Sequence, residues 1–434
     1  MVIEQCNPEW ASVPLLSYNF YHEIRKRAQV TLVTHERNQS ALEKVRGAHT
    51  IDYIRESSLL KRYYSIIRVV TERGAVNWPL QHALSYPIYA EFNHRVSQKY
   101  GPLIRSQKYD IVHVMTPILP RYPVKIIEHC KNTPFLLGPV NGGVPFPPGF
   151  DTVARKEFAR FNFLRMFTRL LPGYTKTYQT ADKVLSGSLY TRSMLMDLFD
   201  MDENAIDLFH ENGILNSFIG TAKKHTSKTM KLLFVGRLVA YKGADMAIKA
   251  LSILPETVQK RLTFTIVGDG PEKAVLEELA KTTGVEARVH FTGWIPQKET
   301  LTHYTQSDVF CFPSVREFGG AVALEAMGCG LPCIVPDYAG LGEYVTEETG
   351  IKIEPKSREY LVQQFAEKIE FLLEHPEIRE SMSTRAIDRV KIYEWGNKAE
   401  KMVALYKKMI QAQKKLTLTS RMGWQTMETH KEQI

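Results

Sequence analysis

The sequence lacks long hydrophobic runs. Its most apolar segments, such as Thr31–Thr34 and Asp308–Pro313, are only as long as β-strands and fall far short of the roughly 18 apolar residues of a membrane span. The first five residues, Met1-Val2-Ile3-Glu4-Gln5, also lack the basic start and the long apolar stretch of a secretory signal. These absences predict a protein that stays in the cytoplasm.

Cysteine is scarce and irregularly spaced, with five residues in a chain of 434. An odd number without a repeated spacing argues against a disulfide framework. Cys329 and Cys333 have no nearby His or Cys partners for a zinc site, and Cys311 and Cys333 stand in apolar runs where a free cysteine acts as a small hydrophobic side chain. All five are predicted to be reduced and structural.

The remaining composition is that of a soluble globular protein, with 44% hydrophobic and 24% charged residues. A chain of this length is too long for one core, which predicts two domains. The net charge of +9 predicts attraction to an anionic partner. Nucleic acid, anionic lipid and phosphorylated small molecules all satisfy that condition, so the charge does not choose among them.

From Lys231 onward, short β-rich runs alternate with helical stretches. Strands are expected at Lys231–Val235, Arg261–Val267, Arg288–Thr292, Val309–Pro313 and Pro332–Val335. Helices are expected at Ala244–Leu254, Pro271–Thr283, Lys298–Ser307 and Gly320–Gly330. This alternation predicts a parallel, doubly wound α/β sheet. Strands that are apolar at successive positions, as in Leu232–Val235, are typical of a sheet covered by helices on both faces.

The first half is less regular but contains the same ingredients. Strands are expected there at Gln29–Thr34, Tyr109–Met115, Phe135–Leu137 and Lys183–Leu185. We therefore predict two Rossmann-like domains that face a cleft. The predicted boundaries are an N-terminal domain at 1–213, a linker at 214–229 rich in Lys, Thr and Ser, a C-terminal domain at 230–385, a helix at 386–412 that returns to the N-terminal domain, and a polar tail at 413–434.

Four features of the second half follow predicted strand ends. They are Gly236-Arg237-Leu238 with Tyr241-Lys242-Gly243, Val267-Gly268-Asp269-Gly270-Pro271-Glu272, Glu317-Phe318-Gly319-Gly320, and Glu325. Open α/β sheets bind ligands at the carboxyl ends of their strands. Glycines let a backbone approach a phosphate closely, and a helix that begins at Gly319–Gly320 would direct free N–H groups at an anion.

The charged residues of this set suit a nucleotide diphosphate. Arg237 and Lys242 supply two fixed cations, which a diphosphate leaving group needs when no metal is present. The carboxylate of Glu325 can accept two hydrogen bonds from a ribose diol, and Glu317, at the end of its loop, can hold sugar hydroxyls. The pieces are weak signals singly, but their joint occurrence in this order is specific.

These residues together resemble the group 1, or family 4, retaining glycosyltransferases, which have the GT-B fold. Arg237 and Lys242 are similar to the pyrophosphate-binding pair of that family, Glu317 and Glu325 to its paired-glutamate motif E-x7-E, and Gly319–Gly320 to its glycine turn. The pattern continues in Gly330-Leu331-Pro332 and in Gly340 and Glu343, so that the resemblance covers residues 183–350.

The resemblance implies a retaining hexosyl transfer from a nucleotide-diphosphate sugar to a carbohydrate or lipid-linked acceptor, with no metal and no cofactor. It implies that Glu317, Arg237 and Lys242 are catalytic. The implied donor-binding residues are Arg237, Lys242, Gly268, Gly270, Glu317, Phe318, Gly319, Gly320 and Glu325.

In that family the N-terminal domain binds the acceptor, and here the sequence departs from the pattern. Pro8–Pro14 stands where an early glycine-rich turn is usual, and Gly138-Pro139-Val140-Asn141-Gly142-Gly143 stands where many members carry a histidine. Asn141, Gly142 and Gly143 are therefore assigned to the acceptor side, with an ordinary glycine-permitted turn as an equal alternative. His113, at the end of a predicted strand, is interpreted as a core histidine.

Two further segments allow more than one interpretation. Asp200-Met201-Asp202 spells a D-x-D, which can hold a metal, but no other ligands lie near it in the sequence, and we predict a polar turn. Ala154–Leu171 places five basic residues among aromatic and aliphatic ones. Such a helix can lie on the inner face of an anionic membrane, but mixed faces favour a partly buried helix with arginine stems along its surface.

Three other functional classes fit less well. A retaining glycosidase needs two carboxyl groups about 5 Å apart, which the spacing of Glu317 and Glu325 does not favour. A nicotinamide-dependent oxidoreductase needs G-x-G-x-x-G after a strand, and Gly268-x-Gly270 lacks the third glycine. A binding protein without activity would have no need for all four charged residues.

Overall fold

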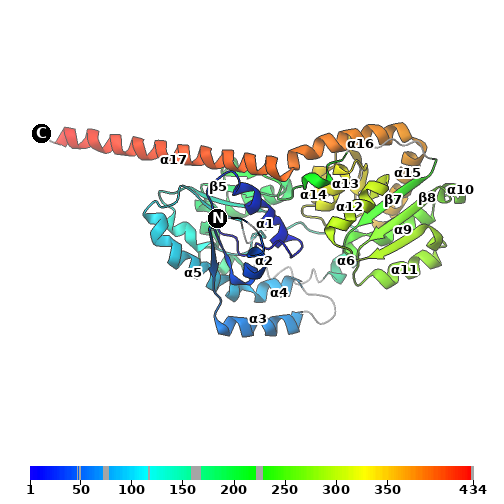
Figure 1. Ribbon diagram of the computed structural model, residues 1–434, viewed down its shortest axis with the longest axis horizontal. Helices are drawn as coiled ribbons and strands as arrows, with labels where there is room; N and C mark the ends of the chain where they lie inside the picture. Colours follow the sequence, from blue (N-terminus) through cyan, green and yellow to red (C-terminus); the bar gives the residue numbers. More distant parts are fainter. Residues whose placement is uncertain are drawn as a thin grey trace.

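The computed structural model describes residues 1–45, 47, 50–71, 78–115, 118–157, 168–220 and 228–431. It consists of two α/β domains joined side by side, with a long C-terminal helix that runs from the C-terminal domain across the N-terminal one (Figure 1). Each domain is built on parallel strands. Among the described residues, no helix is both long and apolar enough to cross a membrane.

The C-terminal domain contains a parallel sheet of six strands in the order β12-β11-β10-β7-β8-β9. Its strands are β7 (Met230–Val235), β8 (Leu262–Val267), β9 (Val289–Gly293), β10 (Val309–Cys311), β11 (Cys333–Pro336) and β12 (Gly350–Ile353). The five strands predicted for this half are all present, each within two residues of its expected ends. The prediction missed β12, which is a short edge strand that carries a glycine and a lysine.

Helices follow these strands as the alternation predicts. The four predicted ones are α9 (Ala244–Ser252), α11 (Lys273–Thr282), α12 (Gln297–Gln306) and α13 (Ala321–Gly328), and they are joined by α14 (Ala339–Tyr344), α15 (Arg358–Glu374) and α16 (Pro376–Val390). Residues of the strands are buried at successive positions, as in β7, where Leu232, Leu233, Phe234 and Val235 all lie in the core. Helices on both faces account for that pattern.

The N-terminal domain is also built on parallel strands, in two hydrogen-bonded groups. They are β1 (Thr31–His35) with β2 (Thr50–Ile54), and β3 (Val112–Val114), β4 (Phe135–Val140), β5 (Lys183–Ser186) and β6 (Ile206–Leu208) in that order. Val2 bridges the two groups, because it pairs with Val33 of β1 on one side and Val114 of β3 on the other. The predicted strands are present, while β2 and β6 were missed.

One segment of the first half lies on the C-terminal domain. Residues 144–157 leave the N-terminal domain, and Phe150 and Val153 are buried in the core of the C-terminal one. At the end of α6 (Asp151–Lys156), Lys156 forms an ion pair of 3.4 Å with Glu272. We call residues 144–157 the crossing arm. The boundaries at 213 and 230 therefore do not separate the two domains completely.

The chain also returns to the N-terminal domain at its C-terminal end. After α16 and a short 3-10 turn, α17 (Trp395–Lys431) packs against α1 (Val13–Ile24) through the buried Trp395, Ala399, Met402 and Tyr406. Trp395 donates its backbone N–H to Ile214, so this return crossing lies beside the outgoing one. Of the predicted linker 214–229, residues 221–227 lie outside the described part.

The segment predicted as a polar tail from 413 continues α17, which ends at Lys431. Its first turns are packed, and a packed helix propagates through polar residues once it is nucleated. No proline interrupts the sequence between 413 and 431. All five cysteines are buried, and none of them forms a disulfide in the part of the chain that the structure describes, which fits their interpretation as structural residues.

Trp395 should be the residue of α17 whose loss costs most. It is 5% exposed, packs edge-on against Phe20 at 4.9 Å between ring centroids, and lies at the crossing between the domains. Truncating a buried tryptophan costs about 3–5 kcal/mol. We expect Trp395→Ala to lower the midpoint of thermal unfolding clearly, whereas Ile392→Ala, at a position 48% exposed, should leave it nearly unchanged. Equal midpoints for the two variants would contradict the packing described.

Candidate active site

Three neighbouring strands of the C-terminal sheet end in loops that bind one another. Leu238, in the loop after β7, donates its backbone N–H to Asp269 in the loop after β8, at 2.9 Å. Val315, in the loop after β10, donates to Tyr241 at 3.0 Å. The loop after β7 therefore contacts both others, and together they form one surface at the carboxyl ends of the strands, where ligands of such sheets bind.

Gly268 and Gly270 make this contact sterically possible. A Cβ atom at Gly268 would lie 2.0 Å from the carbonyl oxygen of Gly236, and one at Gly270 would lie 2.3 Å from that of Leu238. Both glycines also have positive φ angles, 142° and 159°, which other residues rarely adopt. The two glycines therefore allow one loop backbone to approach another, in addition to any approach to a phosphate.

Lys242 and Glu317 meet at the centre of this surface. The ammonium of Lys242, at the end of the turn Ala240–Lys242, forms a close ion pair with the carboxylate of Glu317. Their side chains are only 13% and 18% exposed, and the Lys242 ammonium also lies 5.1 Å from the centre of the Phe312 ring. Arg237 lies on the same loop but is exposed, with its guanidinium 3.4 Å from the hydroxyl of Tyr241.

The glycine turn that follows Glu317 is held from two directions. Gly320, at φ 58°, precedes α13, and the carbonyl oxygen of Phe318 accepts a hydrogen bond of 3.0 Å from the Asn141 amide of the N-terminal domain. On the other side, Gly340 donates its N–H to the Glu317 carbonyl at 3.0 Å. Gly319 is enclosed so tightly that a Cβ atom there would lie 2.2 Å from a Glu211 oxygen.

Glu325 is buried behind this turn. One carboxylate oxygen accepts a hydrogen bond of 2.6 Å from Gln297, and the other accepts one of 2.9 Å from the hydroxyl of Tyr304. Burial raises the pKa of Glu325, while its two donors lower it. A carboxylate has about four acceptor positions, so a ribose hydroxyl would share these oxygens with Gln297 and Tyr304 or would displace Gln297.

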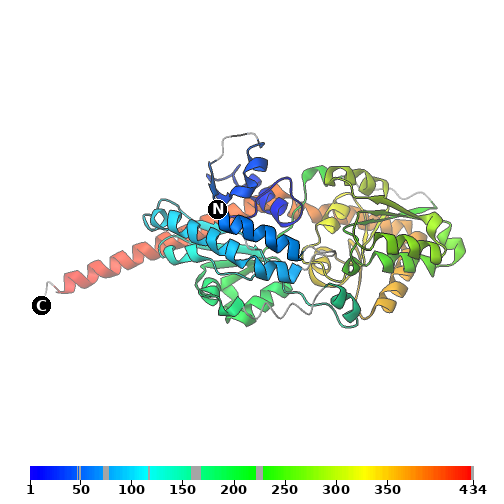
Figure 2. The same cartoon turned by 90° about the horizontal axis from the view of Figure 1, so that it is seen from below.

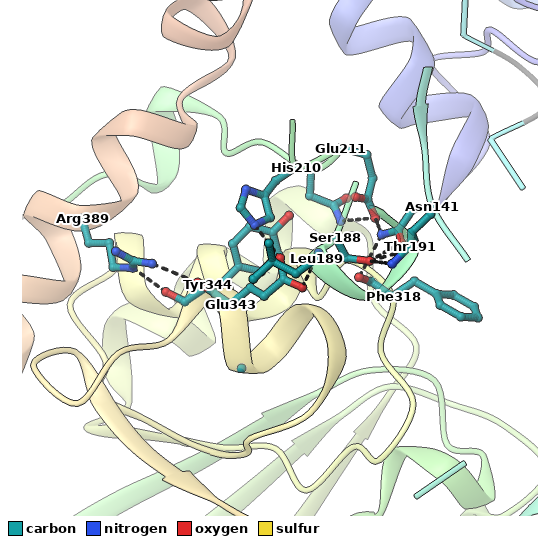
Figure 3. A network of polar contacts seen from close by, with 12 residues as sticks. Asn141, Ser188, Leu189, Thr191, His210, Glu211, Phe318, Glu343, Tyr344 and Arg389 are labelled. Atoms are coloured by element: carbon teal, nitrogen blue, oxygen red, sulfur yellow. Dashed lines mark hydrogen bonds and ion pairs between the residues drawn. The ribbon is translucent and has the colours of Figure 1, made fainter. Parts of the chain in front are cut away.

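Asn141 has no hydrogen-bonding capacity left for a substrate. Its amide nitrogen donates to Glu211 at 2.7 Å as well as to Phe318, and its oxygen accepts from Ser188 at 2.9 Å and from Thr191 at 2.7 Å (Figure 3). An amide can donate twice and accept twice. Asn141, which the sequence analysis assigns to the acceptor side, thus connects the two domains through its hydrogen bonds.

Gly142 and Gly143 follow this tie. Gly142 donates its N–H to the Thr191 hydroxyl at 3.0 Å, and both glycines have positive φ angles, 147° and 85°. A Cβ atom at Gly143 would lie 2.3 Å from the sulfur of Met194 on α8 (Leu189–Phe199). The glycines therefore let the loop after β4 lie flat on α8.

Glu211 is the buried centre of the contact between the domains. It is buried, at 4% exposure, its second carboxylate oxygen has no hydrogen-bond partner, and burial raises its pKa to about 7. The positive charge of Lys398 on α17 counteracts that rise, and burial lowers the pKa of Lys398 to about 7 in turn. Lys398 also donates to the carbonyl of His210. A carboxylate and an ammonium thus share one buried site between the domains.

A second polar contact lies beside the first. Glu343 on α14 accepts a hydrogen bond of 2.8 Å from the N–H of Leu189, and it pairs with His210 at 2.9 Å (Figure 3). Leu189 begins α8 of the N-terminal domain, where a carboxylate is favoured by free N–H groups. Both residues that continue the sequence pattern therefore have a structural role. Gly340 fixes the glycine turn, and Glu343 connects the two domains.

Arg316 places a cation between the glycine turn and the crossing arm. Arg316, next to Glu317, donates to the carbonyl of Val144 in the crossing arm at 3.3 Å, and its guanidinium lies 4.7 Å from the Phe146 ring. Burial lowers the pKa of Arg316, and it lowers the pKa of Arg121 in the N-terminal domain, where the charge of Arg316 adds to the effect. The two guanidinium groups therefore lie close enough for their charges to interact.

Two interpretations from the sequence are confirmed. His113 is a core histidine: its ring nitrogens bond the Tyr406 hydroxyl at 2.5 Å and the Gly138 carbonyl at 2.6 Å, and burial lowers its pKa to about 3. The D-x-D is a polar turn, in which Asp200 ends α8 with φ 50° and Asp202 accepts the N–H of Asn204. Over the residues that the structure describes, no cluster of three His, Cys, Asp or Glu side chains could hold a metal.

Sequence reasoning missed Glu211, Arg316 and the crossing arm. A signal for Glu211 exists, since His210-Glu211-Asn212-Gly213 is a polar run directly after the apolar Ile206 and Phe209 region and before the linker. Nothing in the arm's own sequence says which domain it joins. Of the segment Ala154–Leu171, residues 158–167 lie outside the described part, so the structure does not decide between its two interpretations.

Comparisons with known proteins fit this geometry. Residues 220–389 match the family of group 1 glycosyl transferases. The match covers most of the C-terminal domain, which is therefore similar to the domain of that family. An uncharacterised glycosyltransferase of Methanocaldococcus jannaschii is 34% identical over 178 residues, which are 41% of this chain and 44% of the relative. D-inositol 3-phosphate glycosyltransferase of Corynebacterium glutamicum is 30% identical over 184 residues, 41% and 43% of the two chains.

Each of these matches spans less than half of the relative, whereas solved structures match nearly the whole chain. Anabaena HepE in complex with UDP superimposes with a TM-score of 0.61 at 14% identity, over 94% of this chain and 98% of that one. Sucrose-phosphate synthase of Thermosynechococcus elongatus gives 0.62 at 17% identity, over 95% and 98%. This likeness shows the fold, which is GT-B, as the sequence predicts.

The buried Glu211 carboxyl predicts a pH-dependent stability. It binds its proton more tightly in the folded state, at a pKa of about 7, than at the ordinary value of 4.5. The wild type should therefore lose stability relative to Glu211→Gln as pH rises from 4.5 to 7, by more than about 1 kcal/mol. Urea unfolding at pH 5 and pH 8 measures the difference, with exposed Glu348→Gln as the control for one lost carboxylate. A constant difference across this range would contradict a buried, tightly held proton.

Proposed function

We propose that this protein moves a hexosyl group from a nucleotide-diphosphate sugar to a carbohydrate or lipid-linked acceptor, with retention of configuration and without a metal. The observation that carries the proposal is the ion pair of Lys242 with Glu317, at the point where three strand-end loops meet in the domain that matches the group 1 glycosyl transferases. One cation and one carboxylate are thereby placed beside a glycine turn that begins a helix.

The diphosphate is proposed to bind between the loop after β7 and the glycine turn. Lys242 and Arg237 would neutralise its charge as the bond to the sugar breaks, and the N–H groups at the start of α13 would donate hydrogen bonds to a phosphate oxygen. In the unliganded protein Lys242 is paired with Glu317. A diphosphate would take over part of that pairing, which would leave the Glu317 carboxylate free to bind sugar hydroxyls.

The two glutamates are proposed to serve different parts of the donor. Glu317 would face the sugar, which gains positive character as it leaves the diphosphate. Glu325 lies further along, on α13, where it is buried and hydrogen-bonded to Gln297 and Tyr304. It would bind the ribose. In the retaining mechanism proposed for that family the departing diphosphate would itself accept the acceptor's proton, so no covalent nucleophile on the protein is assigned.

The acceptor is proposed to bind on the N-terminal side of the cleft, with the backbone of Gly142 and Gly143 at its wall. Arg121 and Arg316 would favour an acceptor with an anionic group. One relative with a matching domain is named for D-inositol 3-phosphate, which is consistent with such an acceptor. Contact with an anionic membrane on the cytoplasmic side would bring a lipid-linked acceptor to this cleft.

Lys242 provides the sharper test of the diphosphate site. Removing a preorganised charge that stabilises a leaving group lowers turnover by on the order of a hundredfold, so Lys242→Ala should do so while Lys281→Ala, an exposed lysine of the same domain, should not. Turnover is measured with a panel of nucleotide-diphosphate sugars in excess EDTA. Unchanged turnover in folded Lys242→Ala would remove this residue from the mechanism, and activity that requires added magnesium or manganese would contradict metal independence.

The glutamates should separate in steady-state kinetics. Ribose contacts are similar in the ground and transition states, so Glu325→Gln should mainly raise the Michaelis constant for the donor. Contacts of Glu317 with the sugar should strengthen towards the transition state, so Glu317→Gln should mainly lower turnover and still bind the nucleoside diphosphate. Donor titrations and calorimetry with the diphosphate measure both effects. The roles are reversed if Glu317→Gln abolishes diphosphate binding and Glu325→Gln leaves it intact.

A further inference from the structure

Helix α3 (Ser58–Thr71) exposes an apolar strip to solvent. Leu59, Ile66, Val69 and Val70 are 76%, 61%, 62% and 52% exposed. Leu59, Ile66 and Val70 follow one another at intervals of seven and four positions, which places them on one face of a helix, with Val69 beside them. Scattered exposed hydrophobic residues are ordinary, but four on a helix of 14 residues form a continuous apolar surface.

A neighbouring face of α3, formed by Tyr63, Tyr64 and Ile67, holds the helix to the protein. Ile67 is buried, Tyr63 donates its hydroxyl to the carbonyl of Leu84 on α4 (Trp78–Leu84) at 3.0 Å, and the guanidinium of Arg37 lies 4.1 Å from the Tyr64 ring. The apolar strip is therefore not the inner face of the helix. In Figure 1 α3 is the outermost helix at the lower edge of the N-terminal domain, and Figure 2, seen from below, shows it in front.

The charge of α3 indicates what the strip contacts. The helix carries Lys61, Arg62 and Arg68 and has no acidic residue between Ser58 and Thr71, and Lys61 forms an ion pair of 2.9 Å with Glu36. A helix with apolar and basic residues side by side suits the boundary between anionic headgroups and acyl chains. At about 1.5 Å per residue it is too short to cross a bilayer, so it would lie along the surface.

The position of α3 relates this surface to the cleft. It begins shortly after β2 ends at Ile54, at the carboxyl edge of the N-terminal strands. This is the edge that faces ligands in such sheets. A bilayer that received the strip would therefore lie beside the part of the N-terminal domain where the acceptor is proposed to bind.

We propose that the exposed face of α3 is a docking surface for an anionic lipid bilayer. Leu59, Ile66, Val69 and Val70 enter the headgroup boundary, and Arg62 binds lipid phosphates. The binding itself does not depend on the proposed transfer reaction; only the statement that it presents a lipid-linked acceptor to the cleft rests on that function.

The test is sedimentation of the full chain with vesicles of phosphatidylcholine alone or mixed with phosphatidylglycerol. The wild type should bind the mixed vesicles, and high salt should weaken that binding. The triple variant Leu59→Ser, Ile66→Ser, Val70→Ser should bind the mixed vesicles at least roughly tenfold more weakly than the wild type. Arg62→Ala should bind them about fivefold more weakly. A matched triple variant of exposed apolar residues in the C-terminal domain, Ile253→Ser, Val275→Ser and Ile392→Ser, should bind like the wild type.

The outcomes separate this proposal from its alternatives and from the proposed function. No binding by the wild type, or equal binding by the α3 triple variant, overturns it. A wild type that forms dimers in solution, which the α3 triple variant abolishes, overturns it in favour of contact with a second copy. Diphosphate binding, measured on the same variants by calorimetry, should be unchanged, so that failure of vesicle binding and failure of the donor site are read from different measurements.

Discussion

The hydrogen bond from the Asn141 amide to the carbonyl of Phe318 is the contact on which the arrangement of this protein depends. It joins the loop after β4 in one domain to the glycine turn that begins α13 in the other. Asn141 is fixed in turn by Ser188, Thr191 and the buried Glu211. A buried polar network stabilises a structure most when all of its polar groups are hydrogen-bonded. In this network one carboxylate oxygen of Glu211 has no hydrogen-bond partner. The position of the glycine turn therefore depends on side chains that never need to contact a substrate.

The glycines of the strand-end loops serve the same constraint. Ligands bind where the strand order of an open sheet reverses, here between β7 and β10, which are neighbours although β8 and β9 separate them in sequence. Three loops must then share a small space. Gly268 and Gly270 permit this because their α-carbons lie against the carbonyls of Gly236 and Leu238. A Cβ atom at either position would clash with the neighbouring loop. Glycine is therefore needed for the contact between the loops, apart from any approach to a phosphate.

Sequence reasoning succeeded where the signal is local. Apolar runs such as Leu232–Val235 specify buried strands, and the glycine and charged residues after them mark the strand ends, so the sequence predicts the C-terminal sheet and the loops that carry Lys242 and Glu317. The ion pair between these two residues was not predicted. The role of Asn141 could not, because its four partners come from segments up to 177 positions apart in the chain. Nor could the crossing arm, whose Phe150 and Val153 would be apolar in either domain. Contacts between two domains produce no periodic pattern in the sequence of either domain.

The ion pair of Lys242 with Glu317 links the domain contact to the chemistry. Glu317 is the residue immediately before Phe318, whose carbonyl is held by Asn141, and its own carbonyl is held by Gly340. The backbone on both sides of the carboxylate is thus fixed before any donor arrives, and a group fixed in advance loses little entropy when it binds. The Lys242 ammonium, by contrast, ends a flexible aliphatic stem, so it can change its partner more easily than the carboxylate can. Of the two partners, Glu317 is therefore the more firmly positioned, because its loop is bonded by Asn141 of the N-terminal domain and by Gly340 of the C-terminal one.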